Sequence, residues 1–226
     1  MYSYLFFDLD GTLCESGPGI LEAFRYSLDQ MGVPFPDVDP NTFIGPPLLE
    51  LYQRYCGMSY DEANEAIRLY RAYYQRESIY HTPAYKEIRA VLDGLKERGF
   101  RLAVATSKPD AMAKKLMGLV GLADCFEEIV GASLDESCHK KGDVIAKALR
   151  LLHEPDRADV LMIGDRAEDI RGAKENGLDS CGVLYGYGSR KELEKAGADY
   201  IAETPADLFR AAEGTREKGT FSEHDL

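Results

Sequence analysis

Four groups of polar side chains in this sequence follow short apolar runs or begin segments with helical spacing. The groups are Asp8 and Asp10, Thr106 and Ser107, Lys141, and Asp165 and Asp169. In an open parallel sheet, ligands bind outside the carboxyl ends of the strands, near the point where the strand order reverses. We therefore expect the four groups to converge on one site.

The carboxylates of this expected site need a cation. Two like charges a few ångströms apart repel each other by about 4 kcal/mol at moderate dielectric. Asp8, a backbone carbonyl and Asp165 offer hard oxygen ligands of the kind that suit Mg²⁺, which commonly binds one or two carboxylates together with a substrate phosphate. The residues therefore predict Mg²⁺ as the cofactor.

Asp8 and Asp10 lie where an apolar strand gives way to a turn at Gly11, so both carboxylates can face one reacting group. One can attack phosphorus and form an aspartyl phosphate. The other can protonate the leaving oxygen and then activate water. Thr106 and Lys141 are expected to hold the phosphoryl oxygens as charge spreads in the transition state.

Each group also has an explanation without catalysis. The Asp-Leu-Asp-Gly stretch can be a solvated turn, and Thr106 can cap a helix. Asp165 and Asp169 can stabilise a helix N-terminus, and Lys141 can be a solvated lysine. The buried character of the strand before Asp8 favours function for the first group, and the presence of the companion groups favours it for the others.

Short, continuous apolar runs alternate with amphipathic segments from residue 100 onward, which is typical of parallel strands buried on both faces. The runs lie at 100–106, 127–132, 160–165, 180–186 and 199–203, and Tyr4–Asp8 adds one near the N-terminus. Apolar residues at helical spacing between the runs predict crossover helices. The predicted fold class is α/β, with a doubly wound, Rossmann-like parallel sheet.

Residues 14–82 break this alternation, because they hold only helical patterns and Pro-punctuated turns. We therefore predict a small helical cap domain at 14–82, inserted after the first strand. The α/β core domain is predicted at 1–13 and 83–212. Residues 213–226 are predicted to be a disordered tail, because they are polar and have little to bury.

The composition and charge indicate which partners are disfavoured and which cellular compartment is expected. A net charge of −12 and a pI near 4.9 argue against a nucleic-acid polymer or a membrane surface as partner. Five scattered cysteines without a C-x-x-C pair suggest neither a disulfide framework nor a zinc site. No apolar run approaches the roughly 18 residues of a membrane span, and no basic region precedes an apolar stretch at the N-terminus. A cytoplasmic protein is expected.

Four stretches of the sequence resemble, in order, the motifs of haloacid dehalogenase superfamily phosphatases: DLDGTL (8–13), VATSK (104–108), KGDVI (141–145) and GDRAED (164–169). The resemblance covers nearly the whole chain, including a helical cap after the first motif. Within the superfamily the chain looks most like the phosphoglycolate phosphatase branch. The stretches SGPGI, FIGPPL and KGDVI resemble its 5′-nucleotidase-like group.

The resemblance implies that Asp8 is the nucleophile and a Mg²⁺ ligand, and that Asp10 is the general acid/base and offers a backbone carbonyl to the metal. It implies that Asp165 is a second metal ligand and that Asp169 reaches the metal through water. The implied phosphate contacts come from Leu9, Gly11, Thr106, Ser107 and Lys141.

The predicted function is Mg²⁺-dependent hydrolysis of a small phosphate ester, either a nucleoside 5′-monophosphate or phosphoglycolate, by a monomer or weak dimer. A phosphosugar mutase that uses the same aspartyl phosphate, or a phosphate-binding sensor without turnover, is the alternative. Lys140 is an alternative to Lys141 as the phosphate ligand. We prefer Lys141 because the spacing of Val144 and Ile145 places it at a helix start.

Overall fold

The chain forms two compact units in the computed structural model, which describes residues 2–133 and 140–214. One unit comprises the described residues of Met1–Cys14 and Ala84–Leu226, and the other is Glu15–Pro83. The two junctions between the units lie one residue from those expected between a core and a cap. The roles of core and cap stay predictions. Of the predicted tail at 213–226, Glu213 ends a helix and Gly214 is the C-cap of that helix, and the rest lies outside the described residues.

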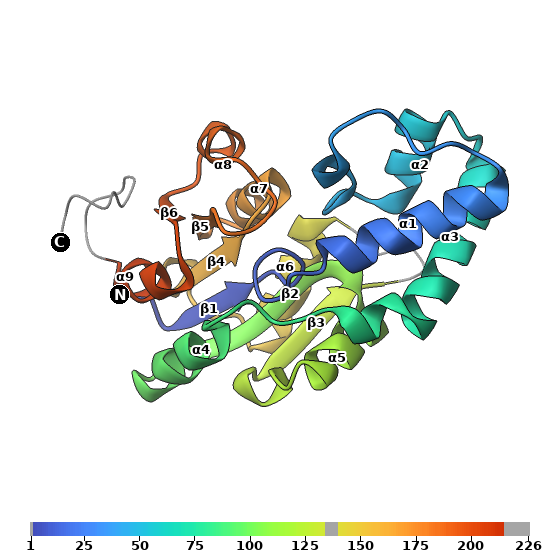
Figure 1. Ribbon diagram of the computed structural model, residues 1–226. Coiled ribbons are helices and arrows are strands. Elements are labelled where there is room, and N and C mark those ends of the chain that lie inside the picture. Colours follow the sequence, from blue (N-terminus) through green and yellow to red (C-terminus); the bar gives the residue numbers. More distant parts are fainter. Residues whose placement is uncertain (1, 134–139, 215–226) are drawn as a thin grey trace. The chain divides into compact units, whose positions relative to one another are not determined.

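The first unit is built on a six-stranded sheet with the order β3-β2-β1-β4-β5-β6, in which all neighbouring strands are parallel (Figure 1). The strands are β1 (Tyr4–Phe7), β2 (Arg101–Pro109), β3 (Glu128–Ala132), β4 (Val160–Gly164), β5 (Asp179–Val183) and β6 (Tyr200–Ala202). This topology confirms the predicted fold class. Two strand ends differ from the prediction by more than one residue: β2 continues to Pro109 instead of ending at Thr106, and β5 ends at Val183 instead of Gly186.

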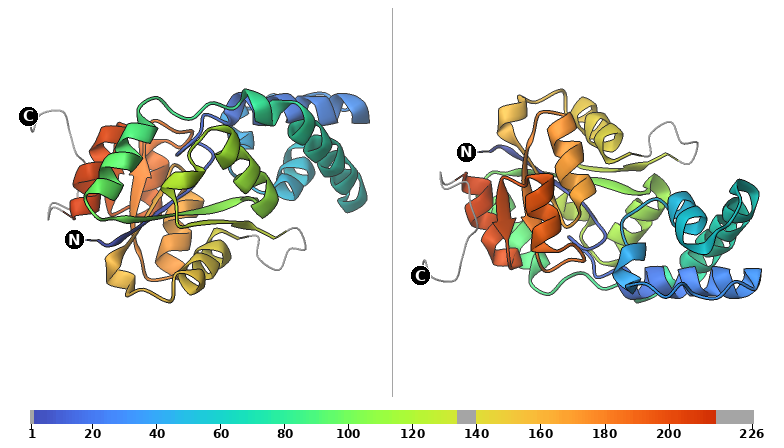
Figure 2. Two further views of the ribbon diagram at one scale, coloured as in Figure 1. Left: turned by 90° about the horizontal axis from the view of Figure 1, so that it is seen from below. Right: turned by 90° about the horizontal axis from the view of Figure 1, so that it is seen from above.

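Helices cover both faces of this sheet, as Figure 2 shows. One face carries α4 (Ile88–Glu97), α5 (Asp110–Leu119) and α9 (Leu208–Glu213), and the other carries α6 (Lys141–Leu151), α7 (Ala167–Glu175) and α8 (Arg190–Ala196). Short 3₁₀ turns lie at Ala123–Cys125, Arg157–Asp159 and Pro205–Asp207. Among the described helices, none combines the length and the apolar character needed to cross a membrane.

The double covering explains the continuous apolar run in β1. Phe6 packs into the cluster that α6 supplies with Val144 and Ile145. Leu5 and Phe7, which point to the opposite face by strand alternation, are also fully buried. The ring of Phe7 meets that of Phe126 edge to face, with centroids 5.9 Å apart. A strand buried on both faces has no polar position until it ends, so the first carboxylate comes directly after it.

The second unit consists of α1 (Gly17–Met31), α2 (Leu48–Cys56) and α3 (Tyr60–Arg76), with 3₁₀ turns at Pro40–Phe43 and Ser78–His81. Its core is aromatic: the ring centroid of Phe24 lies 4.7 Å from that of Phe43 and 4.5 Å from that of Tyr52. A capping box between Ser59 and Glu62 begins α3. This unit therefore has its own packed centre.

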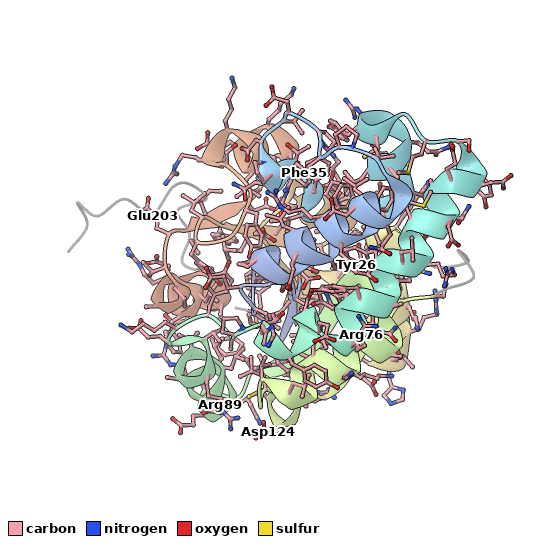
Figure 3. All side chains as sticks on the ribbon, turned by 45° about the vertical axis from the view of Figure 1, so that its right-hand side comes forward. Tyr26, Phe35, Arg76, Arg89, Asp124 and Glu203 are labelled. Carbon is pink, nitrogen blue, oxygen red and sulfur yellow. The ribbon has the colours of Figure 1, made fainter. Side chains whose placement is uncertain are left out.

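Two of the three tyrosines that α3 presents at helical spacing are core residues. Tyr70 and Tyr74 are buried and stacked on each other. Tyr73 is half-buried and stacks at 4.2 Å on Tyr26, while its hydroxyl donates to Glu22 at 3.0 Å. Tyr26 is labelled in Figure 3. Packing within the unit thus accounts for this stripe.

Candidate active site

The turn after β1 holds Asp8 and Asp10 at the carboxyl edge of the sheet. The amide of Asp8 donates to the Ile163 carbonyl at 2.8 Å, so Asp8 continues the pairing of β1 with β4. Gly11 has φ of +88°, and a Cβ there would lie 2.2 Å from Asp165 Oδ2. Glycine is needed for both reasons. The chain can therefore turn sharply and bring β1 against the carboxylate that follows β4.

Three carboxylates from separate motifs meet at this edge. Asp8, Asp165 and Asp169 are buried, and each offers a ligand oxygen that lies within 4.8 Å of the other two. Asp8 follows β1, Asp165 follows β4, and Asp169 belongs to the first turn of α7. The structure thus brings together the carboxylates of three of the four acidic residues predicted to bind a metal; the fourth, Asp10, was expected to offer its backbone carbonyl.

Lys141 lies among these carboxylates at the start of α6. Its Nζ is 2.5 Å from Asp8 Oδ1 and 2.7 Å from Asp169 Oδ1, and it donates to the Ala105 carbonyl at 2.9 Å. Burial lowers the pKa of Lys141, but the Asp169 and Asp8 carboxylates more than offset this, so its pKa is raised and it stays charged. Lys140, by contrast, is exposed.

Two of these carboxyl groups, Asp8 and Asp165, have raised pKa values although Lys141 lies among them. Burial raises the pKa of Asp8 to about 6; Lys141 opposes this rise, and Asp169 and Asp10 add to it. Burial, followed by the charges of Asp169 and Asp8, raises the pKa of Asp165 well above its usual value. A further cation at these oxygens would favour the ionised forms.

The end of β2 supplies the other expected phosphate-binding residues. Thr106 is buried, and its Oγ1 accepts a hydrogen bond from the Lys108 amide at 3.2 Å. This bond engages the hydroxyl as an acceptor, so its proton can be donated to an anion. Ser107 is half-buried and Leu9 is fully buried. The carbonyl of Leu9 accepts from the amides of the following turn.

Lys108 is a site residue for which the sequence predicts no role. Its Nζ contacts both carboxylate oxygens of Asp10, at 3.0 and 2.9 Å, and the side chains of Lys108 and Asp10 are 6% and 16% exposed. With Lys141, two ammonium groups face four carboxylates, which leaves a formal charge of −2 when all are ionised. Hard oxygen ligands with this excess negative charge fit Mg²⁺.

The segment Tyr185–Ser189 crosses directly over Asp165 and was not recognised from the sequence as part of the site. The Tyr187 amide donates to Asp165 Oδ2 at 2.8 Å. A Cβ on Gly186 would lie 2.3 Å from the Gly11 carbonyl oxygen, and one on Gly188 would lie 1.8 Å from the Asp165 carbonyl oxygen. These close approaches require glycine at both positions, and the spacing G-Y-G is the signal in the sequence that could have revealed them.

Gly188→Ala is expected to lower kcat/KM by about 100-fold for the phosphate ester hydrolysis that the sequence predicts, because a shift of about 1 Å at a catalytic group has costs of this size. The added methyl group must displace the segment from Asp165, and the Tyr187 hydrogen bond is then lost. Steady-state kinetics and urea unfolding test this, with an expected loss of about 1–3 kcal/mol in stability from overpacking.

Gly118→Ala in α5 is the matched control, because a Cβ there meets nothing within 4 Å. It should keep full activity and gain about 0.5–1 kcal/mol in stability, as Gly to Ala does inside a helix. Equal kinetics for the two variants would contradict a role for the close packing over Asp165.

Known proteins resemble this chain in sequence over most of its length. The family model described as "Haloacid dehalogenase-like hydrolase" matches residues 5–183. The tyrosine-protein kinase PtkA of Mycobacterium tuberculosis is 39% identical, over 92% of this chain and 71% of its own. The 5′-nucleotidase of Pseudomonas aeruginosa is 36% identical, over 85% of this chain and 87% of its own.

A solved structure is similar over almost its full length. The crystal structure of a predicted phosphatase from Clostridium acetobutylicum matches with a TM-score of 0.88 and 40% identity, covering 93% of this chain and 98% of that one. The chain therefore belongs to the haloacid dehalogenase-like hydrolases. This confirms the family and the hydrolase class expected from the four motifs.

Proposed function

We propose that this protein is a Mg²⁺-dependent phosphomonoesterase that works through an aspartyl phosphate on Asp8. The observation that carries the proposal is the buried group of Asp8, Asp165 and Asp169 with Lys141 among them, at the carboxyl edge of β1 and β4. Membership of the hydrolase family supports it. Asp8, Asp165 and a backbone carbonyl of Asp10 would hold the metal, and Asp169 would reach it through water.

The proposed first step forms a bond between an Asp8 oxygen and phosphorus and breaks the bond between phosphorus and the ester oxygen. Asp10, which is protonated at the start of the cycle, gives its proton to that leaving oxygen. The ion pair with Lys141 engages Oδ1 of Asp8, so attack by Oδ2 leaves the pair intact. Lys141 and the Thr106 hydroxyl hold the phosphoryl oxygens, and Leu9, Gly11 and Ser107 line the same edge.

The proposed second step releases phosphate. A water molecule attacks phosphorus and gives a proton to Asp10, and the bond from phosphorus to Asp8 breaks, which restores both carboxyl groups. Bound Mg²⁺ would supply positive charge against the negative charge of the phosphoryl group. Asp10 thus gives up a proton in the first step and regains one in the second, so its protonation cycle closes with each turnover.

Among substrates, we favour a nucleoside 5′-monophosphate, with phosphoglycolate second. The 36% identity with a 5′-nucleotidase supports this order. The test is a panel of nucleoside 5′-monophosphates, phosphoglycolate and hexose phosphates, with kcat/KM measured for each in the presence of Mg²⁺. The highest value is expected for a nucleotide. Isomerisation of a hexose phosphate without phosphate release would favour the mutase, and no turnover of any ester would favour a sensor.

Phosphoryl transfer to a protein tyrosine is a second candidate, because the chain is 39% identical to a protein named a tyrosine kinase. An aspartyl phosphate can pass its phosphoryl group to a phenol as well as to water. Incubation with γ-labelled ATP, followed by phosphotyrosine analysis of the protein, separates the two functions. Label on tyrosine with slow release of phosphate would favour transfer.

The cellular setting is part of the proposal. We infer action on a small molecule in the cytoplasm, by a monomer or weak dimer. The net charge of −12 and the scattered cysteines support this inference.

A further inference from the structure

Lys108 is a buried lysine that the proposed chemistry does not use. Its side chain is 6% exposed, and its Nζ lies 3.0 and 2.9 Å from the two oxygens of Asp10. The second lysine of the site, Lys141, contacts Asp8 and Asp169. The two lysines are therefore divided between the two aspartates of the first motif, with one ammonium group for each.

A bulge in β2 places Lys108 in this position. Thr106 pairs with Gly131 of β3, and the next paired residue, Pro109, is opposite Ala132. Ser107 and Lys108 are thus extra residues in β2, and a bulge of this kind redirects the side chains of the bulged strand. A Cβ on Gly131 would lie 2.6 Å from the Lys108 carbonyl oxygen, so β3 accommodates the bulge only because it has glycine there.

The contact fixes the direction of the Asp10 carboxylate. Asp10 follows the last residue of β1 by three positions and precedes a glycine with positive φ, so the backbone alone does not lock its side chain. An ammonium group that bonds both carboxylate oxygens restricts the rotation of the side chain. When either oxygen turns to a reacting group, the other can keep its bond to Lys108.

We propose that Lys108 is a positioning residue that holds the carboxyl group of Asp10 for both proton transfers. This inference rests on the proposed function, in which Asp10 is the general acid/base. Lys108 itself keeps its protons and forms no bond to phosphorus. Substitution of Lys108 should therefore have the same kinetic effects as substitution of Asp10, but smaller ones.

The experiment compares Lys108→Met, Lys108→Arg, Asp10→Asn and the double variant Lys108→Met/Asp10→Asn. Two esters are used with Mg²⁺: p-nitrophenyl phosphate, whose leaving group needs little protonation, and adenosine 5′-monophosphate, whose leaving group needs a proton. Rapid mixing measures the burst of nitrophenolate and the later steady state. Lys114→Met is the matched control, since Lys114 pairs with Asp110 on the surface.

Lys108→Met should lower kcat for adenosine 5′-monophosphate by about 10- to 100-fold, a part of the usual contribution of acid–base catalysis, with little change in KM. With p-nitrophenyl phosphate it should keep the burst and slow the steady state. Lys108→Arg should recover most of the loss. In the Asp10→Asn background, Lys108→Met should cost less than about 2-fold, because residues that act as a unit are not additive. Lys114→Met should match the wild type.

The inference would be overturned if Lys108→Met lowered kcat equally in the wild-type and the Asp10→Asn backgrounds. A rise in KM for both esters with kcat unchanged would also overturn it. Far-UV circular dichroism checks each variant, and Lys108→Gln replaces Lys108→Met in the cycle if the latter does not fold. A wild-type protein that shows neither burst nor turnover would instead contradict the proposed function. The two failures are therefore distinguishable.

Discussion

Asp8→Asn is expected to lower kcat for p-nitrophenyl phosphate by a factor on the order of 10⁴ or more, as loss of a nucleophile does in other enzymes with covalent intermediates. A neutral amide does not attack phosphorus, and the proposed route has no other nucleophile for the first step. The fold should persist, because asparagine has the same shape and Lys141 keeps its ion pair with Asp169. Steady-state kinetics and urea unfolding measure the two effects.

Asp159→Asn is the control for this substitution. Asp159 is exposed and directly precedes β4, whereas Asp165 directly follows that strand. The same chemical change at the opposite edge of the sheet should leave kcat unchanged. If Asp8→Asn kept kcat within 10-fold of the wild type while remaining folded, Asp8 would not be the nucleophile.

Removal of divalent cations is expected to have the second largest effect. Two unit charges 4 Å apart at moderate dielectric interact by about 4 kcal/mol, which corresponds to about 10³-fold in rate. Dialysis against EDTA should therefore lower kcat/KM by about 10³-fold, because the substrate phosphate would meet a site with uncompensated carboxylates. Added Mg²⁺ should restore the rate.

Thermal unfolding provides a second measurement of the same site. Mg²⁺ binds the folded protein at Asp8, Asp165 and Asp169 in our proposal, so millimolar Mg²⁺ should raise the Tm by mass action. Asp165→Asn should remove most of this rise, and Asp159→Asn should keep it. Full activity after dialysis, together with a Tm that does not respond to Mg²⁺, would contradict a metal site at these residues.

The sequence was sufficient to predict the sheet and the edge at which the acidic residues meet. The apolar run of β1 is continuous because Phe6 and its neighbours are buried on opposite faces. A polar residue that directly follows such a run must lie at the carboxyl edge of the sheet. The same reasoning applies to Asp165 after β4, and the family resemblance then suggested a role for each residue.

The sequence was not sufficient where tertiary pairing decides the conformation. The apolar pattern of β2 ends at Thr106, so nothing in it shows that two extra residues bulge against Gly131 and place Lys108 beside Asp10. The apolar run of β5 was predicted to reach Gly186, but β5 ends at Val183. The following residues cross over Asp165, where two glycines allow contact between backbones.

The most direct test of the account is to identify the phosphorylated residue. The Asp10→Asn variant is mixed with p-nitrophenyl phosphate and Mg²⁺, quenched in acid, reduced with borohydride and analysed by peptide mass spectrometry. Borohydride converts an aspartyl phosphate into homoserine, and we expect homoserine at position 8 when both substrate and Mg²⁺ are present. Reduction at another aspartate, or homoserine at position 8 without substrate, would contradict Asp8 as the group that receives the phosphoryl.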